Sequence, residues 1–123
     1  MEANQYETSR FSIVENSGRE FINISEVVRL MADGSCTWVY LQNGRKILTT
    51  KNLGYYNDIL PKPIDKFENT FFRIHYKHII NLSGLSNYNS REKYIKIIDG
   101  QTLPIAQRRV SSFCKMLKSF NLY

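Results

Sequence analysis

The sequence predicts a mainly β fold with a few short α-helices. Three observations indicate this class: short runs of β-branched and aromatic residues, glycine-containing turn sequences between these runs, and only two stretches with clear helical periodicity. At 123 residues the chain has the length of one domain with a single core. An apolar content of 42% and an aromatic content of 13% favour a folded chain over a disordered one. We expect residues 1–9 to be a flexible segment and residues 10–123 to form the domain.

The first strands are expected over residues 10–31. Apolar and polar residues alternate from Phe11 onward, and the sequence Asn-Ser-Gly-Arg at 16–19 is typical of a turn. Residues 27–31 are apolar and partly β-branched, and the next turn is expected at residues 32–35.

Two hairpins are indicated farther along the chain. Asn43–Gly44 separates two alternating segments, 38–41 and 46–50, and Asn-Gly in this position is a strong hairpin signal. Asp99–Gly100 joins a β-branched run to a short segment that ends at Pro104. Because proline has no backbone N–H, we expect Pro104 at a strand end or a sheet edge.

Two helices are expected. The first spans residues 51–60, with Thr50 as its N-cap and Leu53, Tyr56 and Leu60 on one face. The second spans about residues 107–120, where one apolar stripe consists of Val110, Phe113, Cys114, Leu117 and Phe120. A shorter helical turn is expected around residues 76–81.

The positive charge is concentrated in one half of the chain. Residues 1–61 hold six Lys/Arg and seven Asp/Glu, a balance of −1, whereas residues 62–123 hold eleven and four, a balance of +7. After Asp99 the sequence has no acidic residue. A general contribution to solubility is one explanation, but the one-sided distribution favours a polyanionic partner.

Several classes of protein are disfavoured. The first residues lack the hydrophobic stretch of a signal peptide, and no run approaches the roughly 20 apolar residues of a membrane span. The two cysteines, Cys36 and Cys114, suit reduced thiols in a cytoplasmic protein better than a disulfide framework. We therefore expect a cytoplasmic protein without a membrane partner.

The residues also disfavour an enzyme. His75 and His78 have no carboxylate or thiolate nearby in sequence to complete a metal site, and hydrogen bonding or packing is the simpler role for both. Cys36 fits an ordinary strand residue better than a nucleophile. The sequence has neither a phosphate-binding glycine pattern of the GxxxxGK type nor a GxSxG motif. We expect no catalytic activity, no metal and no cofactor.

Two segments, 72–81 and 100–110, carry basic and amide side chains among apolar residues. Such groups suit contacts with phosphates and base edges. Arg108 and Arg109 open the last predicted helix, where cations oppose the helix dipole. Their position therefore indicates binding of phosphate or guanine, the alternative being a solvated basic surface.

Most of the aromatic residues fall at positions expected to face the core. Tyr76 is the exception, because it lies between His75 and Lys77 in the most polar part of its segment. Base stacking by Tyr76 and Tyr88 is therefore an alternative mode of nucleic-acid binding.

The two segments resemble motifs of the LytTR family of DNA-binding domains, which occur at the C-terminus of many bacterial response regulators. Residues 72–81 read Phe-Arg-Ile-His-Tyr-Lys-His-Ile-Ile-Asn, close to the family's Phe-x-Arg-Ile-His-Arg-Ser-x-Ile-Val-Asn. Asp99–Gly100 and residues 103–109, Leu-Pro-Ile-Ala-Gln-Arg-Arg, are similar to the motifs that follow in the family. Residues 24–34 also fit, so the resemblance covers about residues 10–120.

This resemblance implies elongated antiparallel sheets of LytTR type, with loops rather than a recognition helix reading successive major grooves of double-stranded DNA. It assigns Ser35, Cys36 and Thr37 to the first contact loop, Tyr76 and Lys77 to the second and Arg108 to the third. Arg108 suits guanine O6 and N7, and Lys46, Lys77 and Arg109 suit phosphates. The chain departs from the family at Tyr76–Lys77, where the family has Arg-Ser, and at Ala106, where it has Ser.

The sequence thus predicts a sequence-specific, DNA-binding transcription regulator or the effector domain of a two-component response regulator. A receiver domain needs about 100 residues, which the segment before the first strand does not supply. Two copies on repeated half-sites are the expected arrangement. The alternatives are a β-rich interaction or sensory module that does not bind DNA, and a single-stranded nucleic-acid binder.

Overall fold

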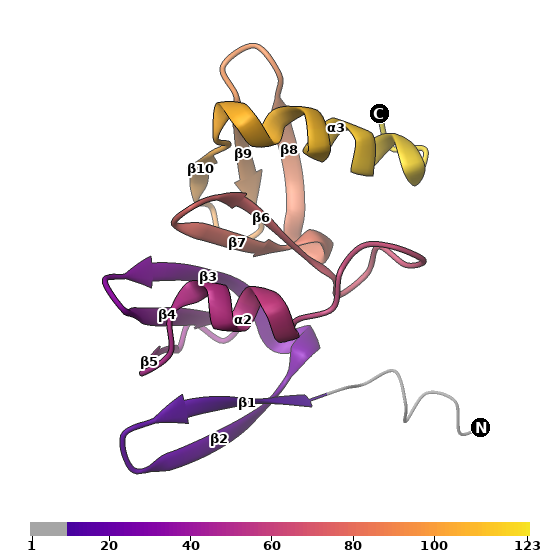
Figure 1. Ribbon diagram of the computed structural model, residues 1–123. Coiled ribbons are helices and arrows are strands. Elements are labelled where there is room, and N and C mark those ends of the chain that lie inside the picture. Colours follow the sequence, from indigo (N-terminus) through magenta and orange to yellow (C-terminus); the bar gives the residue numbers. More distant parts are fainter. Residues whose placement is uncertain (1–9) are drawn as a thin grey trace, which may run out of the picture.

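The computed structural model describes residues 10–123, in which ten strands form three antiparallel sheets (Figure 1). The expectation of a flexible segment at residues 1–9 falls outside the described residues. The strands are β1 (Arg10–Glu15), β2 (Gly18–Asn23), β3 (Val27–Asp33), β4 (Cys36–Leu41), β5 (Lys46–Thr49), β6 (Phe71–His75), β7 (His78–Asn81), β8 (Leu85–Asn89), β9 (Tyr94–Ile97) and β10 (Thr102–Pro104). The helices are α2 (Leu53–Ile59) and α3 (Val110–Ser119), and the short 3₁₀ turns are η1 (Ile24–Glu26), η2 (Leu82–Gly84) and η3 (Gln107–Arg109). The mainly β fold class is confirmed.

A central five-stranded sheet, in the order β5-β4-β3-β7-β6, is covered on both faces. The β1–β2 hairpin and α2 pack on one face, and the β10-β9-β8 sheet and α3 pack on the other. Strand β3 serves both cores, because Val27 and Leu30 join the first and Val28 joins the second. Burial on both faces explains why residues 27–31 read as a nearly continuous apolar run.

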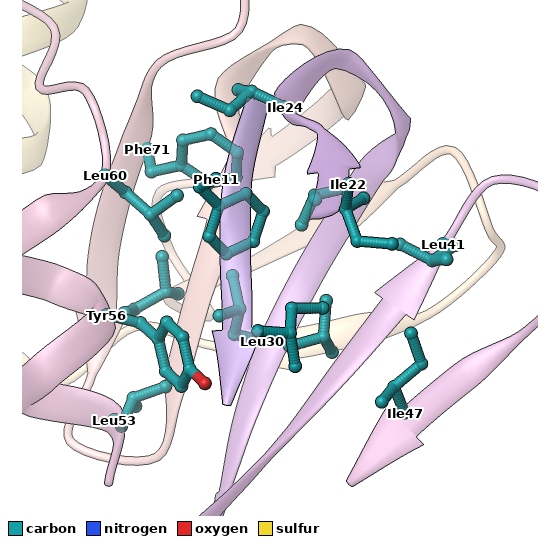
Figure 2. Packing of buried hydrophobic residues seen from close by; sticks show 14 residues of the cluster. Phe11, Ile22, Ile24, Leu30, Leu41, Ile47, Leu53, Tyr56, Leu60 and Phe71 are labelled. Carbon is teal, nitrogen blue, oxygen red and sulfur yellow. The ribbon is translucent and has the colours of Figure 1, made fainter. Parts of the chain in front are cut away.

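The first core lies between the central sheet, α2 and the β1–β2 hairpin (Figure 2). Tyr56 of α2 is fully buried there, and its ring packs edge-on against Phe11 of β1. The Tyr56 hydroxyl accepts a hydrogen bond from the backbone N–H of Val14 at 3.2 Å. This contact joins strand β1 of the hairpin to α2.

The predicted hairpins are confirmed, and so is Pro104 at the end of an edge strand. The structure corrects the expected helical turn at residues 76–81: Tyr76–Lys77 is a tight turn and His78–Asn81 is strand β7. Pairing with β3 on one side and β6 on the other outweighs the local preference of so short a segment.

Both helices differ at their beginnings from the expectation. Asn52, not Thr50, caps α2, and its Oδ1 accepts from the Tyr55 N–H at 2.9 Å. Residues 107–109 form a 3₁₀ turn before α3 begins at Val110, and Ala106 provides no side-chain cap. Of the predicted stripe, Phe113 and Leu117 are buried, and Met116 is buried beside them.

Candidate nucleic-acid interface

Three polar segments meet at one end of the molecule: the β3–β4 turn, the β6–β7 turn and the segment that enters α3. In Figure 1 they lie on the same side, at the left of the view. The β3–β4 turn is a tight one because Gly34 has a φ of 61°, a left-handed conformation that suits glycine. Ser35 is therefore presented at the tip of the hairpin, where it is exposed.

Backbone hydrogen bonds connect the three segments. The Ala32 N–H donates to the Lys77 carbonyl at 2.9 Å, which joins the first segment to the second. The Ala106 N–H donates to the Ile74 carbonyl at 2.8 Å, which joins the third to the second. The β6–β7 hairpin is thus the element that fixes the other two relative to each other.

The β6–β7 turn is stabilised from within by two side chains. Arg73 Nη2 donates to the Tyr76 carbonyl at 2.6 Å, and the Lys77 N–H donates to His75 Nδ1 at 3.1 Å. As a result the side chains of Tyr76 and Lys77 point away from the fold, and Tyr76 is 62% exposed. The hydrogen-bonding role expected for His75 is confirmed, whereas the supporting role of Arg73 was not expected from the sequence.

The imidazole of His75 favours its neutral form, in which one ring nitrogen can donate a hydrogen bond. Burial, followed by the positive charges of Lys77 and Arg109, lowers the pKa of His75 below its ordinary value. Because its Nδ1 accepts from the backbone, the proton of the neutral ring lies on Nε2. That N–H has no partner within residues 10–123 and can donate to a base edge.

The arginines of the third segment lie close to the second. Arg109 Nη1 donates to the Arg73 carbonyl at 3.5 Å, and Arg108 is exposed beside it. Burial and then the neighbouring Arg108 lower the pKa of Arg109. The two side chains therefore add positive charge to the same edge as Lys77.

Not every predicted residue belongs to this edge. Thr37 is fully buried, and its hydroxyl donates to the Lys51 carbonyl at 2.8 Å, so its side chain supports the turn from inside. Cys36 is half-buried at the start of β4. Lys46 pairs with Tyr40 near the far end of β4, where its Nζ lies 4.8 Å from the centre of the Trp38 ring.

Two further side chains have structural roles. Asn81, the amide at the end of the 72–81 motif, is buried, and its Nδ2 donates to the Val27 carbonyl at 2.9 Å. Tyr88 packs edge-on against Phe113 at 5.1 Å, and burial raises its pKa to about 12. Its ring therefore belongs to the second core and does not form a stacking surface with Tyr76.

Within residues 10–123 no group of three His, Cys, Asp or Glu side chains is arranged to hold a metal ion. No helix in this range is long and apolar enough to cross a membrane.

Comparison with known proteins identifies the family and the fold of the chain. The sequence pattern of the LytTr DNA-binding domain matches residues 17–118. A solved structure, the LytTr DNA-binding domain of a protein described as a methyl-accepting/DNA response regulator from Bacillus cereus, is similar with a TM-score of 0.70. The two share 22% identity over 89% of this chain and 96% of the other, so this likeness concerns the fold.

No curated protein sequence matches. Because the family pattern spans most of its length, the chain belongs to the LytTr family, a family of DNA-binding domains rather than of enzymes.

Proposed function

We propose that this domain binds double-stranded DNA sequence-specifically and regulates transcription, with its three polar segments entering the major groove. The observation that carries the proposal is the pair of backbone hydrogen bonds, Ala32 to Lys77 and Ala106 to Ile74, that gathers the segments on one edge. A single duplex lying along that edge can contact all three.

The contacts divide into base readers and phosphate anchors. Arg108 has the planar donor geometry for guanine O6 and N7, a contact worth about 1–3 kcal/mol of discrimination. Ser35 and Tyr76 supply further donors and acceptors at the tips of the turns, and His75 does so at the end of β6. Lys77 and Arg109 suit phosphates, which give affinity and register. Lys46 suits a phosphate farther along the duplex.

The proposal is tested by duplex binding as a function of salt concentration. We expect wild-type affinity to fall steeply as salt rises, because each neutralised phosphate releases counterions. Arg108→Ala should flatten the preference at one base position, whereas Lys118→Ala, at the other end of α3, should leave the preference unchanged. Absence of salt-dependent duplex binding by the wild type, or stronger binding to single strands, would refute the proposal.

The regulatory setting follows from the same proposal. Two copies on repeated half-sites would supply the affinity that one small domain lacks. A receiver domain that controls such an effector, and a cytoplasmic location beside the DNA, complete this picture of a response regulator.

A further inference from the structure

Three arginines gather at the interface without a carboxylate partner. Arg73 on β6 and Arg108 and Arg109 on η3 form no ion pair within residues 10–123, whereas Arg29 and Arg45 pair with Asp99 and Glu20. Burial, and then the charges of Arg109 and Arg108, lower the pKa of Arg73. Like charges held together in this way attract an anion, which would relieve their repulsion.

Arg73 borders a hollow of about 530 Å³ between the β3–β4 turn, the start of α2 and the β6–β7 turn. Lys77 lies on the same rim, and Gly34 and Gly54 leave the backbone uncovered there. Asp33 is the carboxylate that borders the hollow, and its Oδ2 accepts a hydrogen bond from Trp38 Nε1 at 3.0 Å. The hollow is therefore bordered by two cations, Arg73 and Lys77, and by one carboxylate, Asp33, which already accepts a hydrogen bond.

The guanidinium of Arg73 is held in place before any ligand arrives. Its Nη2 donates to the Tyr76 carbonyl at 2.6 Å, and its Nε is buried. That buried Nε has no hydrogen-bond partner within the described residues, so the guanidinium keeps N–H groups that a ligand can accept from. Because the side chain is already ordered, binding an anion there costs less conformational entropy than binding by a free surface lysine.

We propose that this hollow binds one phosphate of the DNA backbone, with Arg73 as its anchor and Lys77 beside it. The inference rests on the proposed function and extends it: when the β3–β4 and β6–β7 turns enter the major groove, the sugar–phosphate strand that borders the groove passes over the hollow. Arg73 then performs two tasks, since it also fixes the turn that carries Tyr76 and Lys77.

The first test compares salt dependence among variants, on the tightest duplex that the wild type selects from a random-sequence pool. Loss of one phosphate contact reduces the slope of log affinity against log salt by about 0.9. We expect this reduction for Arg73→Gln, a nearly unchanged slope for Arg73→Lys, and no change for Arg91→Gln, an exposed control in the β8–β9 loop. A wild-type slope in Arg73→Gln would overturn the assignment.

The second test replaces each phosphate of that duplex, one at a time, with a neutral methylphosphonate. At one position the substitution should weaken wild-type binding several-fold and have no further effect on Arg73→Gln. Independent, additive effects at every position would overturn the inference. Should Arg73→Gln fail to fold, Arg73→Lys carries the test, because its ammonium should remain coupled to the same phosphate; absence of coupling there would also overturn it.

The experiments distinguish a DNA phosphate from a free phosphate ion as the ligand. They also distinguish failure of this inference from failure of the proposed function. Inorganic phosphate at low millimolar concentration should neither raise the wild-type melting temperature nor compete with DNA. Stabilisation by inorganic phosphate that disappears in Arg73→Gln, with an unchanged DNA salt slope, would assign the hollow to a small phosphorylated ligand instead. A wild type that does not bind duplex refutes the proposed function, whereas a wild type that binds without an Arg73 contribution refutes only this inference.

Discussion

At the scale of single residues, His78 shows how strongly this fold alters a side chain's acid–base behaviour. It lies half-buried on β7, and its Nδ1 has no hydrogen-bond partner within residues 10–123. Burial, and then the charges of His75, Arg29 and Lys77, lower its pKa to about 4 from the ordinary 6.5. The imidazole is therefore neutral at pH 7, and protonation would add a charge to an already cationic region.

This shift predicts acid sensitivity. Between about pH 4 and 6.5 the unfolded chain binds a proton at His78 that the folded chain does not, so the free energy of unfolding falls as pH decreases through this interval. Above pH 6.5 His78 is neutral in both the folded and the unfolded chain, so the free energy of unfolding no longer changes with pH on account of His78. Urea titrations of the wild type and His78→Gln from pH 4 to 7.5 should show a shallower decline in the variant. Parallel curves would place the sensitivity in other groups.

Two residues of the first predicted contact loop, Ser35 in the β3–β4 turn and Thr37 on β4, should behave in opposite ways. Thr37→Val removes a buried hydrogen bond to Lys51 and should cost about 1 kcal/mol of unfolding free energy, with the base preference unchanged. Ser35→Ala, at the exposed tip, should leave stability within about 0.5 kcal/mol of the wild type but reduce duplex affinity. Urea unfolding and duplex titration of both variants measure these effects. The reverse pattern would show that Thr37 reads DNA directly.

At the scale of elements, the two hairpins with Asn-Gly or Asp-Gly turns could be predicted from the sequence. Strands without such turn sequences, among them β8, could not. Asn43–Gly44 and Asp99–Gly100 set the β4–β5 and β9–β10 hairpins through local conformation. Strand β8 contains Ser86, Asn87 and Asn89 and shows no regular alternation of burial, so its sequence resembles a loop. Its conformation is imposed by pairing with β9.

The β3–β4 turn provides a test of the backbone at element scale. A Cβ at Gly34 would meet no atom within 4 Å, so the cost of Gly34→Ala comes from the left-handed φ of 61° alone. We expect about 1 kcal/mol lower stability and weaker duplex binding. Gly34→Asn should lose less stability and less duplex affinity than Gly34→Ala, since asparagine tolerates this conformation. Equal losses in the two variants would mean that the turn does not depend on its φ.

At the scale of the whole molecule, one ion pair joins the central sheet to the three-stranded sheet. Arg29 of β3 is only 6% exposed, its guanidinium lies 3.7 Å from the centre of the Tyr40 ring, and its Nε donates to Asp99 Oδ2 at 3.2 Å. Asp99 lies in the β9–β10 turn, 70 residues away in sequence. The pair therefore fixes the two layers relative to each other.

Removing one partner should be costly. Asp99→Ala leaves a buried guanidinium unpaired, and we expect a loss of about 2–4 kcal/mol of unfolding free energy. Arg29→Leu combined with Asp99→Ala should recover much of that loss, because the double variant buries no charge. A double-mutant cycle by urea unfolding measures the coupling. Additive losses would show that the pair contributes little to stability.

The sequence predicted which side chains would be exposed at the interface better than it predicted how they come together. Basic and aromatic residues that interrupt apolar segments predicted exposed side chains at Tyr76, Lys77 and Arg108, and all three are exposed. Arg73 was missed because it looks like an ordinary strand residue, and its partners come from the turn and from η3. The alternation of buried residues along β4, with Thr37, Val39 and Leu41 inward, was the signal that would have excluded Thr37.

The hydrogen bonds that tie the three segments together use main-chain atoms, so they do not depend on which side chains the turns carry. If the domain reads DNA as proposed, a substitution at position 35, 76 or 108 should change which nucleotide is favoured and leave the spacing between favoured nucleotides unchanged. Relatives built on the same frame would share the spacing of their operators and differ in the bases found there.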